Sequence, residues 1–431
     1  MTAFIQQGQD MHAWASDLFP IMRSLSGPGV RQTLDYLQNL LPGLEIHSVE
    51  SGTKCFDWTV PDEWTFRAAW IEDEAGNRVI DAANHTLHVV NYSEPVDRWL
   101  SLDELQPHLY SAPETPDWIP YVTSYYRRHW GFCLTHNQRQ TLQPGRYRVV
   151  IDTDLKPGCI NYGELILPGR ETDEILISTY VCHPSMANNE LSGPVLATAL
   201  GRWLSERDRR FTYRIVFLVE TMGAVAYLSR HWHHMKTHTK AGFVLSCVGD
   251  ERGYSFLPSR RGDTLADRAA RRALRDIAGE DWKTYSFLQR GSDERQYCSP
   301  LIDLPVALMM RSKFGEYPEY HTSGDDLSVI TPQGLADSFG LYTHTLDLLE
   351  KNRKLRATLA CEPQLGKRGL YPTISTRDSY LQAQTMVDVL AYADGSLDII
   401  ALADAIGQKA STVLSICDTL LAHGLLEVVW D

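Results

Sequence analysis

Continuous apolar runs alternate with amphipathic segments through the middle of the chain. The runs are residues 174–181, 214–219, 242–247 and 305–310, and the segments with helical spacing are residues 193–205, 222–234, 263–278 and 331–349. Unbroken apolar runs between helices are typical of parallel strands that are covered on both faces. The alternation therefore predicts an α/β domain with a mixed, mostly parallel sheet covered by helices. The segments RYRVVID and GELILPG before it are expected to be edge strands.

Two further regions differ in character from the α/β pattern. Residues 10–41 have helical periodicity that is broken at Ser26-Gly27-Pro28-Gly29, which predicts two helices. Residues 56–124 are rich in Trp, Val, Thr and His, and FRAAWIED and HTLHVVNYS within them are expected to be short strands. We interpret residues 56–124 as a small β-rich insert in an α/β domain formed by residues 1–55 and 125–355.

Residues 356–431 have the outline of a winged-helix domain. A helical segment is followed by LDIIALADAIG and TVLSICDTLLAHG, and LLEVVW reads as a final strand. The second of the paired helices would be the DNA-reading helix, but it contains no Arg or Lys. Because DNA binding depends on cations, this helix is expected to pack or to contact protein, and nucleic acid is not an expected partner.

Composition narrows the class of protein further. The 431 residues include 41 Lys and Arg against 54 Asp and Glu, a net charge of −13, which disfavours a broad grip on nucleic acid or on an anionic membrane. No apolar run approaches the roughly 20 residues of a membrane span, and the N-terminus lacks the features of a secretory signal. The eight cysteines form no CxxC pair. We expect a cytoplasmic protein with reduced thiols, a small-molecule substrate and no membrane partner, and a homo-oligomer remains open.

Candidate catalytic and metal-binding side chains come after the ends of the predicted strands. His183 and Glu190 come after the first buried strand, Glu220 follows the second, and His321 follows the fourth. In open α/β sheets, ligands bind beyond the carboxyl ends of the strands. Histidines and carboxylates that converge there can hold a metal ion beside a general base.

Five motifs, in order, resemble an aminopeptidase-like family related to the zinc aminopeptidases. They are CHPSMANNELSG, VETMG, CVGD, GSDERQYCSP and EYPEYHTSGDDL. The resemblance extends over nearly the whole chain and implies an α/β fold with an inserted small β domain and a C-terminal winged helix. It implies that His183 and His321 are metal ligands and that Glu220 is the general base that deprotonates a metal-bound water.

Three positions depart from the pattern of the zinc aminopeptidases. Asn189 stands where a bridging Asp is expected, Thr221 replaces a ligand Glu, and Cys247 falls where a later Asp would be. Because a single zinc needs only three protein ligands and an open position, we expect one zinc ion rather than two. His183, Glu190 and His321 are the predicted ligands, and the alternative ligands are Cys247, Asp250 and Asp325.

The predicted function is hydrolysis of an amide or peptide bond in a small peptide or an aminoacyl conjugate. Asp293, Glu316 or Glu319 would bind a free amine of the substrate, and Arg311 or Tyr320 would stabilise the oxyanion. Acyl transfer or cyclisation on the same scaffold is one alternative. The other is an inactive binding protein that uses its winged helix for protein contacts.

Overall fold

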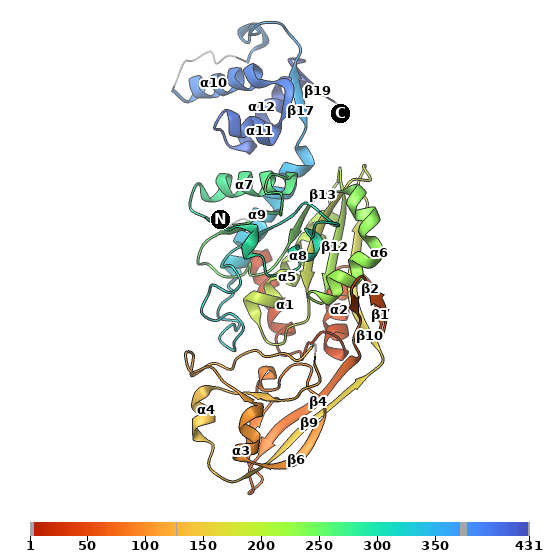
Figure 1. The fold of residues 1–431 in the computed structure, drawn as a ribbon. Helices are drawn as coiled ribbons and strands as arrows, with labels where there is room; N and C mark the ends of the chain where they lie inside the picture. The colour runs from red at the N-terminus through yellow and green to blue at the C-terminus, as the bar shows by residue number, and fades with distance from the viewer. Residues whose placement is uncertain (1–3, 126, 371–376, 430–431) are drawn as a thin grey trace. The chain divides into compact units, whose positions relative to one another are not determined.

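The protein divides into two compact units. The computed structural model describes residues 4–125, 127–370 and 377–429. The first unit comprises residues 1–262 and 283–340, and the second comprises residues 263–282 and 341–431. Figure 1 traces the course of the chain through both units.

An eight-stranded mixed sheet forms the centre of the first unit, in the order β1-β10-β12-β11-β13-β16-β14-β15. Its strands are β1 (Glu45–Glu50), β10 (Cys159–Leu167), β11 (Glu174–Tyr180), β12 (Thr212–Leu218), β13 (Thr239–Val244), β14 (Ser255–Leu257), β15 (Lys283–Thr284) and β16 (Val306–Met310). The four central strands, β12, β11, β13 and β16, run parallel, whereas β1 and β10 pair antiparallel with their neighbours, and β14 pairs antiparallel with β16 and parallel with β15. The predicted fold class is therefore confirmed.

The helices that connect the central strands lie on opposite faces of the sheet. The chain passes from β11 through α5 (Ser192–Ser205) to β12 on one side, and then through α6 (Met222–His238) to β13 on the other side of β11. Right-handed crossovers in opposite directions place their helices on opposite faces, as Figure 1 shows for α5 and α6. Helix α1 (Ile5–Leu18) packs on α5, and α2 (Pro28–Leu40) packs on β10.

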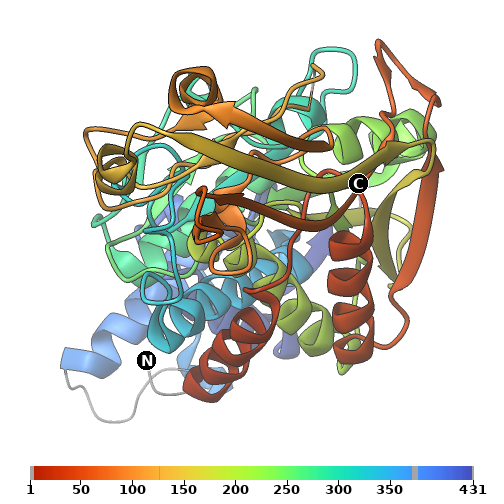
Figure 2. The same cartoon turned by 90° about the horizontal axis from the view of Figure 1, so that it is seen from below.

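A four-stranded antiparallel sheet, in the order β5-β4-β9-β6, forms the β-rich part of this unit. Its strands are β4 (Glu63–Glu72), β5 (Arg78–Asp81), β6 (Val96–Ser101) and β9 (Arg146–Lys156). Figure 2 shows its long curved strands from below. The short elements of the unit are β2 (Lys54–Cys55), β3 (Trp58–Thr59), β7 (Leu109–Tyr110), β8 (Phe132–Cys133), α3 (Leu102–Leu105), α4 (His136–Thr141) and α8 (Glu294–Tyr297). The insert boundaries at 56 and 124 stay a prediction.

Two details of the strand prediction were wrong. RYRVVID and GELILPG were expected at sheet edges, but β9 pairs with β4 and β6, and β10 pairs with β1 and β12. The edges of the large sheet are β15 and β1, and the polar sequence EIHSVE of β1 contains no apolar run that would predict a strand. HTLHVVNYS forms a 3₁₀ turn at Thr86–His88 with two isolated bridges, because the His85 side chain caps the turn at the Leu87 N–H.

The second unit contains the winged helix, and that prediction is confirmed. Helix α10 (Arg377–Tyr392) precedes α11 (Ile399–Ala405) and α12 (Ala410–Ala422), and a small sheet is formed by β17 (Lys354–Ala357), β18 (Asp394–Asp398) and β19 (Leu426–Val429). Helix α7 (Leu265–Ala278) packs on α11 and α12. The long helix α9 (Pro332–Lys351) belongs to both units. Trp430, the last residue of the predicted final strand, lies outside the described residues.

Within the described part of the chain, no single helix has the length and apolar character needed to cross a membrane. Only the pair α11 and α12, bent by 113° at the break between them, satisfies the length and composition criteria jointly.

The start of α5 fits tightly against the end of the sheet, and this contact generates a prediction. A Cβ atom on Gly193 would lie 2.3 Å from the Leu245 carbonyl oxygen and 2.4 Å from Thr179 Oγ1. We therefore expect Gly193→Ala to lower the free energy of unfolding by about 1–3 kcal/mol, since backbone must move to admit the methyl group. Urea unfolding followed by circular dichroism measures this. Gly145→Ala is the control, because its Cβ would make only an ordinary contact at 3.7 Å; equal stability of the two variants would contradict the expectation.

Candidate active site

The candidate site lies at the carboxyl ends of the adjacent strands β11 and β12. Because the chain leaves these two strands toward opposite faces of the sheet, the space beyond their ends is where open α/β sheets bind ligands, and we call this space the crevice. His183 follows the end of β11 by three residues, and Glu220 follows the end of β12 by two. Both side chains are therefore carried by the strand pair at which the topology places a binding site.

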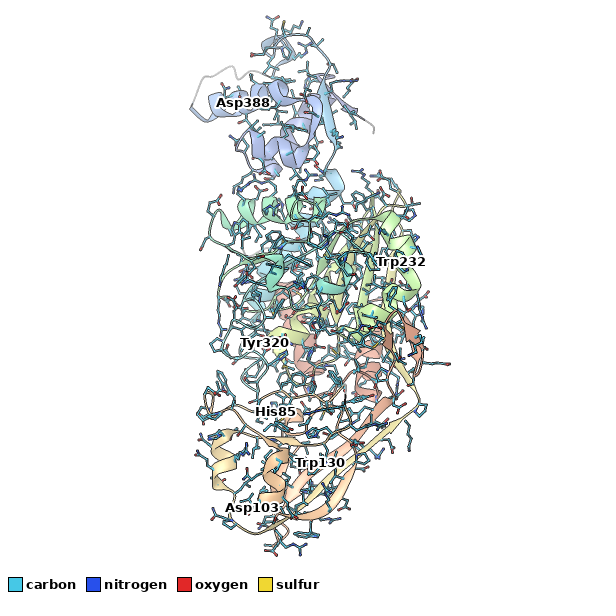
Figure 3. All side chains as sticks on the ribbon, viewed as in Figure 1. His85, Asp103, Trp130, Trp232, Tyr320 and Asp388 are labelled. Atoms are coloured by element: carbon cyan, nitrogen blue, oxygen red, sulfur yellow. The ribbon has the colours of Figure 1, made fainter. Side chains whose placement is uncertain are left out.

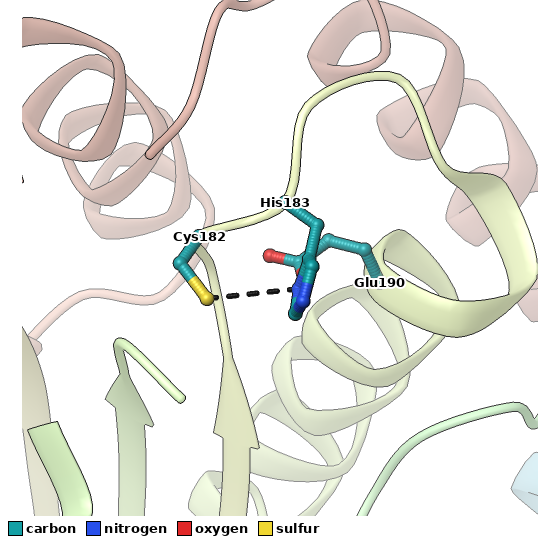
Figure 4. Close-up of side chains that lie close together, drawn as sticks. All are labelled: Cys182, His183 and Glu190. Carbon is teal, nitrogen blue, oxygen red and sulfur yellow. Dashed lines mark hydrogen bonds and ion pairs between the residues drawn. The ribbon is translucent and has the colours of Figure 1, made fainter. Parts of the chain in front are cut away.

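The imidazole of His183 has a carboxylate at each of its nitrogens. Nδ1 lies 2.5 Å from Glu190 Oε2, and Nε2 lies 3.5 Å from Glu220 Oε2. The Cys182 thiol approaches the same Nδ1 at 3.6 Å, as Figure 4 shows. Burial alone lowers the pKa of His183, but Cys182 and Glu190 outweigh it and raise that pKa well above its ordinary value. The site therefore favours a positive charge at this point.

A turn of π-helix, Ala187–Leu191, carries Glu190 toward His183. The Asp325 carboxylate fixes this turn, since it accepts hydrogen bonds from the Asn188 N–H at 2.7 Å and the Asn189 N–H at 2.9 Å. Asp250 accepts from the Asn188 side-chain amide at 2.9 Å and from the backbone of the 311–318 loop. Asp250 and Asp325, considered as alternative ligands, are thus both occupied by hydrogen bonds to the protein.

His321 approaches the same crevice from the loop after β16. Its ring stacks on that of Tyr320, with centroids 3.9 Å apart, and its centroid lies 5.7 Å from that of His183. Tyr320 is labelled in Figure 3. Two imidazoles on one zinc, with Zn–N bonds of about 2.0–2.1 Å, have centroids about 5–6 Å apart. Burial, and then the charge of His183, lower the pKa of His321 to about 3, so it presents a neutral ring with a free lone pair.

Asp293 is a second acidic side chain, beside Glu220, at the end of β12. The backbone N–H of Thr221, which has a φ of 62°, donates to Asp293 Oδ1 at 2.7 Å, and Arg295 donates to the Thr221 hydroxyl. Burial raises the pKa of Glu220, although His183 and Arg295 oppose the shift. Burial and the neighbouring Glu220 also raise the pKa of Asp293 well above its ordinary value, and Asp293 Oδ2 has no hydrogen-bond partner. Such a pair can hold a proton or bind an ammonium group.

The remaining predicted substrate residues lie together in a different place. Arg311 donates from Nε to the Asp250 carbonyl at 2.7 Å, and Glu316 pairs with Lys283 at 2.6 Å. Both line a cavity of about 280 Å³ beside β14 and β15, which we call the 252–318 cavity. Among the described contacts, none joins either side chain to His183 or Glu220. Glu319 forms a bidentate ion pair with Arg252.

Several residues at the site were missed by the sequence reasoning. Arg23 is fully buried and donates from Nε to the His183 carbonyl at 2.9 Å. The ring of Tyr121 lies edge-on to both histidines, at centroid distances of 5.3 Å and 5.2 Å, and its hydroxyl bonds that of Tyr125 at 2.8 Å. Only the tertiary fold brings these residues to the crevice. Cys182 could have been found, because it directly precedes His183.

One buried group within the described residues could hold a metal ion. Donor atoms of Cys182, His183 and Glu190 lie within 4.8 Å of one another, and Glu190 Oε1 is buried without a hydrogen-bond partner. A thiol, an imidazole and a carboxylate are donors that zinc accepts. The donor set therefore fits a divalent cation. His321 lies outside this group of three. Cys247 is fully buried, and burial raises the pKa of its thiol.

The fold and the site define an aminopeptidase-like α/β protein with a C-terminal winged helix. Residues 12–352 match the family described as "Domain of unknown function (DUF4910)", and residues 353–428 match a winged helix-turn-helix family. The chain belongs to the DUF4910 family. It is 41% identical over 426 residues to a protein of Clostridium acetobutylicum named "Putative polysaccharide biosynthesis protein with aminopeptidase-like domain", covering 98% of this chain and 97% of that protein.

Solved structures agree with this assignment. A "putative peptidase" of Clostridium acetobutylicum superposes with a TM-score of 0.93 at 39% identity, covering 99% of this chain and 97% of that chain. BSAP, a zinc aminopeptidase from Bacillus subtilis, superposes with a TM-score of 0.58 at 12% identity, over 79% of this chain and 94% of that chain. An aminopeptidase from Aneurinibacillus sp. strain AM-1 superposes with a TM-score of 0.52 at 12% identity, over 80% of this chain and 95% of that chain. The last two likenesses show the fold alone.

The low pKa of His321 predicts a pH dependence of stability. Its folded value of about 3 lies below the ordinary value of 6.5, so the folded state excludes a proton that the unfolded chain binds. The resulting stability is present above pH 6.5 and is lost as pH falls toward 3. We expect the wild type to lose about 2 kcal/mol of unfolding free energy between pH 7 and pH 5 through His321 alone, and His321→Asn should abolish this part of the loss. Asparagine suits the positive φ of 57° at this position.

Urea unfolding of chelator-treated protein at pH 7 and pH 5 measures this difference. His233→Gln, at an exposed histidine, is the matched control and should keep the wild-type dependence. An unchanged pH dependence in His321→Asn would show that the ring is not held neutral by burial.

Proposed function

We propose that the protein is a metal-dependent hydrolase of amide or peptide bonds with an aminopeptidase-like mechanism. The observation that carries the proposal is the buried imidazole of His183 with a carboxylate at each nitrogen, located in the crevice between β11 and β12. The fold shared with zinc aminopeptidases and the relative named as a peptidase support it. The catalytic role of each residue below is part of the proposal.

One divalent ion, zinc, would be held around His183. His183, Glu190 and His321 are the proposed ligands, and Cys182 is a further donor. Glu190 lies at His183 Nδ1 and Glu220 lies at Nε2, so an ion whose water Glu220 deprotonates would bind His183 through Nε2, and Glu190 would turn from its 2.5 Å contact with Nδ1 to reach that ion. When bound, the ion would lower the pKa of a coordinated water and polarise the scissile carbonyl.

Glu220 is the proposed general base. Its side chain is 22% exposed, so a substrate can reach it, and burial raises its pKa toward the range that suits proton transfer near neutral pH. The carboxylate takes the proton of the attacking water and passes it to the leaving amine. His183 and Arg295 oppose this rise and so favour the ionised carboxylate that a general base requires.

Asp293 and Tyr320 are the proposed substrate contacts. The unpartnered Oδ2 of Asp293 beside Glu220 fits a free amino group, and the Tyr320 hydroxyl is a candidate donor to the oxyanion. The substrate class would be small peptides or aminoacyl conjugates. Because the Clostridium relative is named for polysaccharide biosynthesis, amides of amino sugars belong in the substrate panel.

The metal and the base can be tested separately. We expect Glu220→Gln to keep its zinc but to lose about 10²–10⁴-fold in turnover, because the glutamine amide cannot accept the proton. His183→Ala should lose the zinc itself. Metal content by mass spectrometry of protein purified without chelator, with product masses from an aminoacyl-amide panel, measures both effects. Glu45→Gln, at an exposed glutamate, is the control. Full activity of Glu220→Gln, or full zinc content of His183→Ala, would contradict the assignment.

The amine contact is tested by substrate choice. Asp293→Asn should raise KM for a substrate with a free amine by about tenfold or more, since a charged hydrogen bond contributes about 1.5–3 kcal/mol. The same variant should not change KM for the N-acetylated form of that substrate. Steady-state kinetics on the matched pair measure this, and equal effects on both substrates would refute an amine-binding role.

A further inference from the structure

The 252–318 cavity gathers cationic and aromatic side chains in a protein whose net charge is −13. Its volume is about 280 Å³, and it lies wholly within the first unit. Its four cationic residues are Arg252, Lys283, Arg311 and Lys313. Its three tyrosines are Tyr254, Tyr285 and Tyr317, and Glu316 is the one acidic residue that lines it.

Two of the four cations are neutralised by carboxylates. Lys283 pairs with Glu316 at 2.6 Å, and Arg252 pairs with Glu319 at 2.7 Å. The other two are more deeply buried: Arg311 is 5% exposed and Lys313 is 8% exposed. The charge of the cavity is therefore concentrated on Arg311 and Lys313.

Neither of these buried cations has a carboxylate within hydrogen-bond distance among the described residues. Arg311 Nη1 is buried without a hydrogen-bond partner, and the nearest carboxylate oxygen paired with it, on Asp337, is 4.0 Å away. Lys313 Nζ donates to the carbonyl of the adjacent Phe314 at 3.0 Å, and in the described residues it forms no ion pair. Burying a cation without a counter-charge, or an N–H without an acceptor, costs free energy. An anion in the cavity would lie beside both cations and give them a counter-charge.

Aromatic rings form the walls beside these cations. The guanidinium carbon of Arg311 lies 4.0 Å from the ring centroid of Tyr254, and Lys313 Nζ lies 5.3 Å from that of Tyr285. A ring face partly stabilises a cation, but it supplies no full counter-charge. The rings also offer apolar surface to whatever carries the anionic group.

We propose that the 252–318 cavity is a binding site for a small oxyanion, a carboxylate or phosphate group attached to a compact organic body. Arg311 and Lys313 bind the oxygens, and Tyr254 and Tyr285 contact the body of the ligand. The site does not depend on the proposed hydrolase activity. It gives Arg311 a ligand-binding role in this cavity, where the sequence predicted a role at the reaction centre.

Direct binding of two probes tests the site. Inorganic phosphate and benzoate are titrated into the full-length protein by isothermal titration calorimetry, with sodium chloride held constant, and the thermal midpoint is measured in parallel. One of the probes should bind with a stoichiometry of one and raise the thermal midpoint. Preference for phosphate or for benzoate identifies which oxyanion the site takes.

Variants localise the binding. Lys313→Met should weaken it by about tenfold or more, because a buried charge contact is lost. Lys283→Gln, at a side chain that is 63% exposed and therefore safe for folding, should also weaken it, because it leaves Glu316 without its cation. Lys240→Met, at an exposed ion pair outside the cavity, is the matched control and should bind as the wild type does. Binding of neither probe at concentrations on the order of 10 mM, or equal affinity in all three variants, would overturn the proposal.

Discussion

The site depends on one feature of the topology: the chain leaves two neighbouring parallel strands toward opposite faces of the sheet. Strands β11 and β12 are hydrogen-bonded neighbours, yet the chain leaves one toward α5 and the other toward α6. No helix can then cover the space between their carboxyl ends. His183 and Glu220 meet at 3.5 Å because each is carried past the end of its strand into that space.

A second layer of buried hydrogen bonds holds this arrangement in place. Asp325 fixes the π-turn that presents Glu190, and the fully buried Arg23 holds the carbonyl of His183. Buried polar groups of this kind are costly unless they are satisfied, so the unpartnered oxygens of Glu190 and Asp293 stand out. They lie next to His183 and Glu220, where a cation or an amine would complete their bonding. The missing hydrogen-bond partners of these two carboxylates therefore indicate that the site binds a positively charged group.

Periodicity and motif order predicted much of this molecule, and the limits were physical. Apolar runs located β11, β12, β13 and β16 because those strands are buried on both faces. The polar edge strand β1 has no such signal. For the candidate site, the strand ends predicted that His183, Glu190, Glu220 and His321 come together, and they do, because the position of a residue after a strand fixes where it emerges. Arg23 and Tyr121 reach the crevice through long-range packing, which no local pattern encodes. Arg311 and Glu316 come after β16, as expected, but they line the 252–318 cavity. Their position after a strand did not predict this, since a loop does not fix the direction of its side chains.

The most direct test of the central claim is anomalous diffraction at the zinc absorption edge, from crystals of protein that has been purified without chelator and supplied with zinc. The account predicts a single strong peak within about 2.0–2.3 Å of a ring nitrogen of His183, with Glu220 beside it. A map with no peak at the crevice, or with zinc bound only at a distance from His183, would contradict the account.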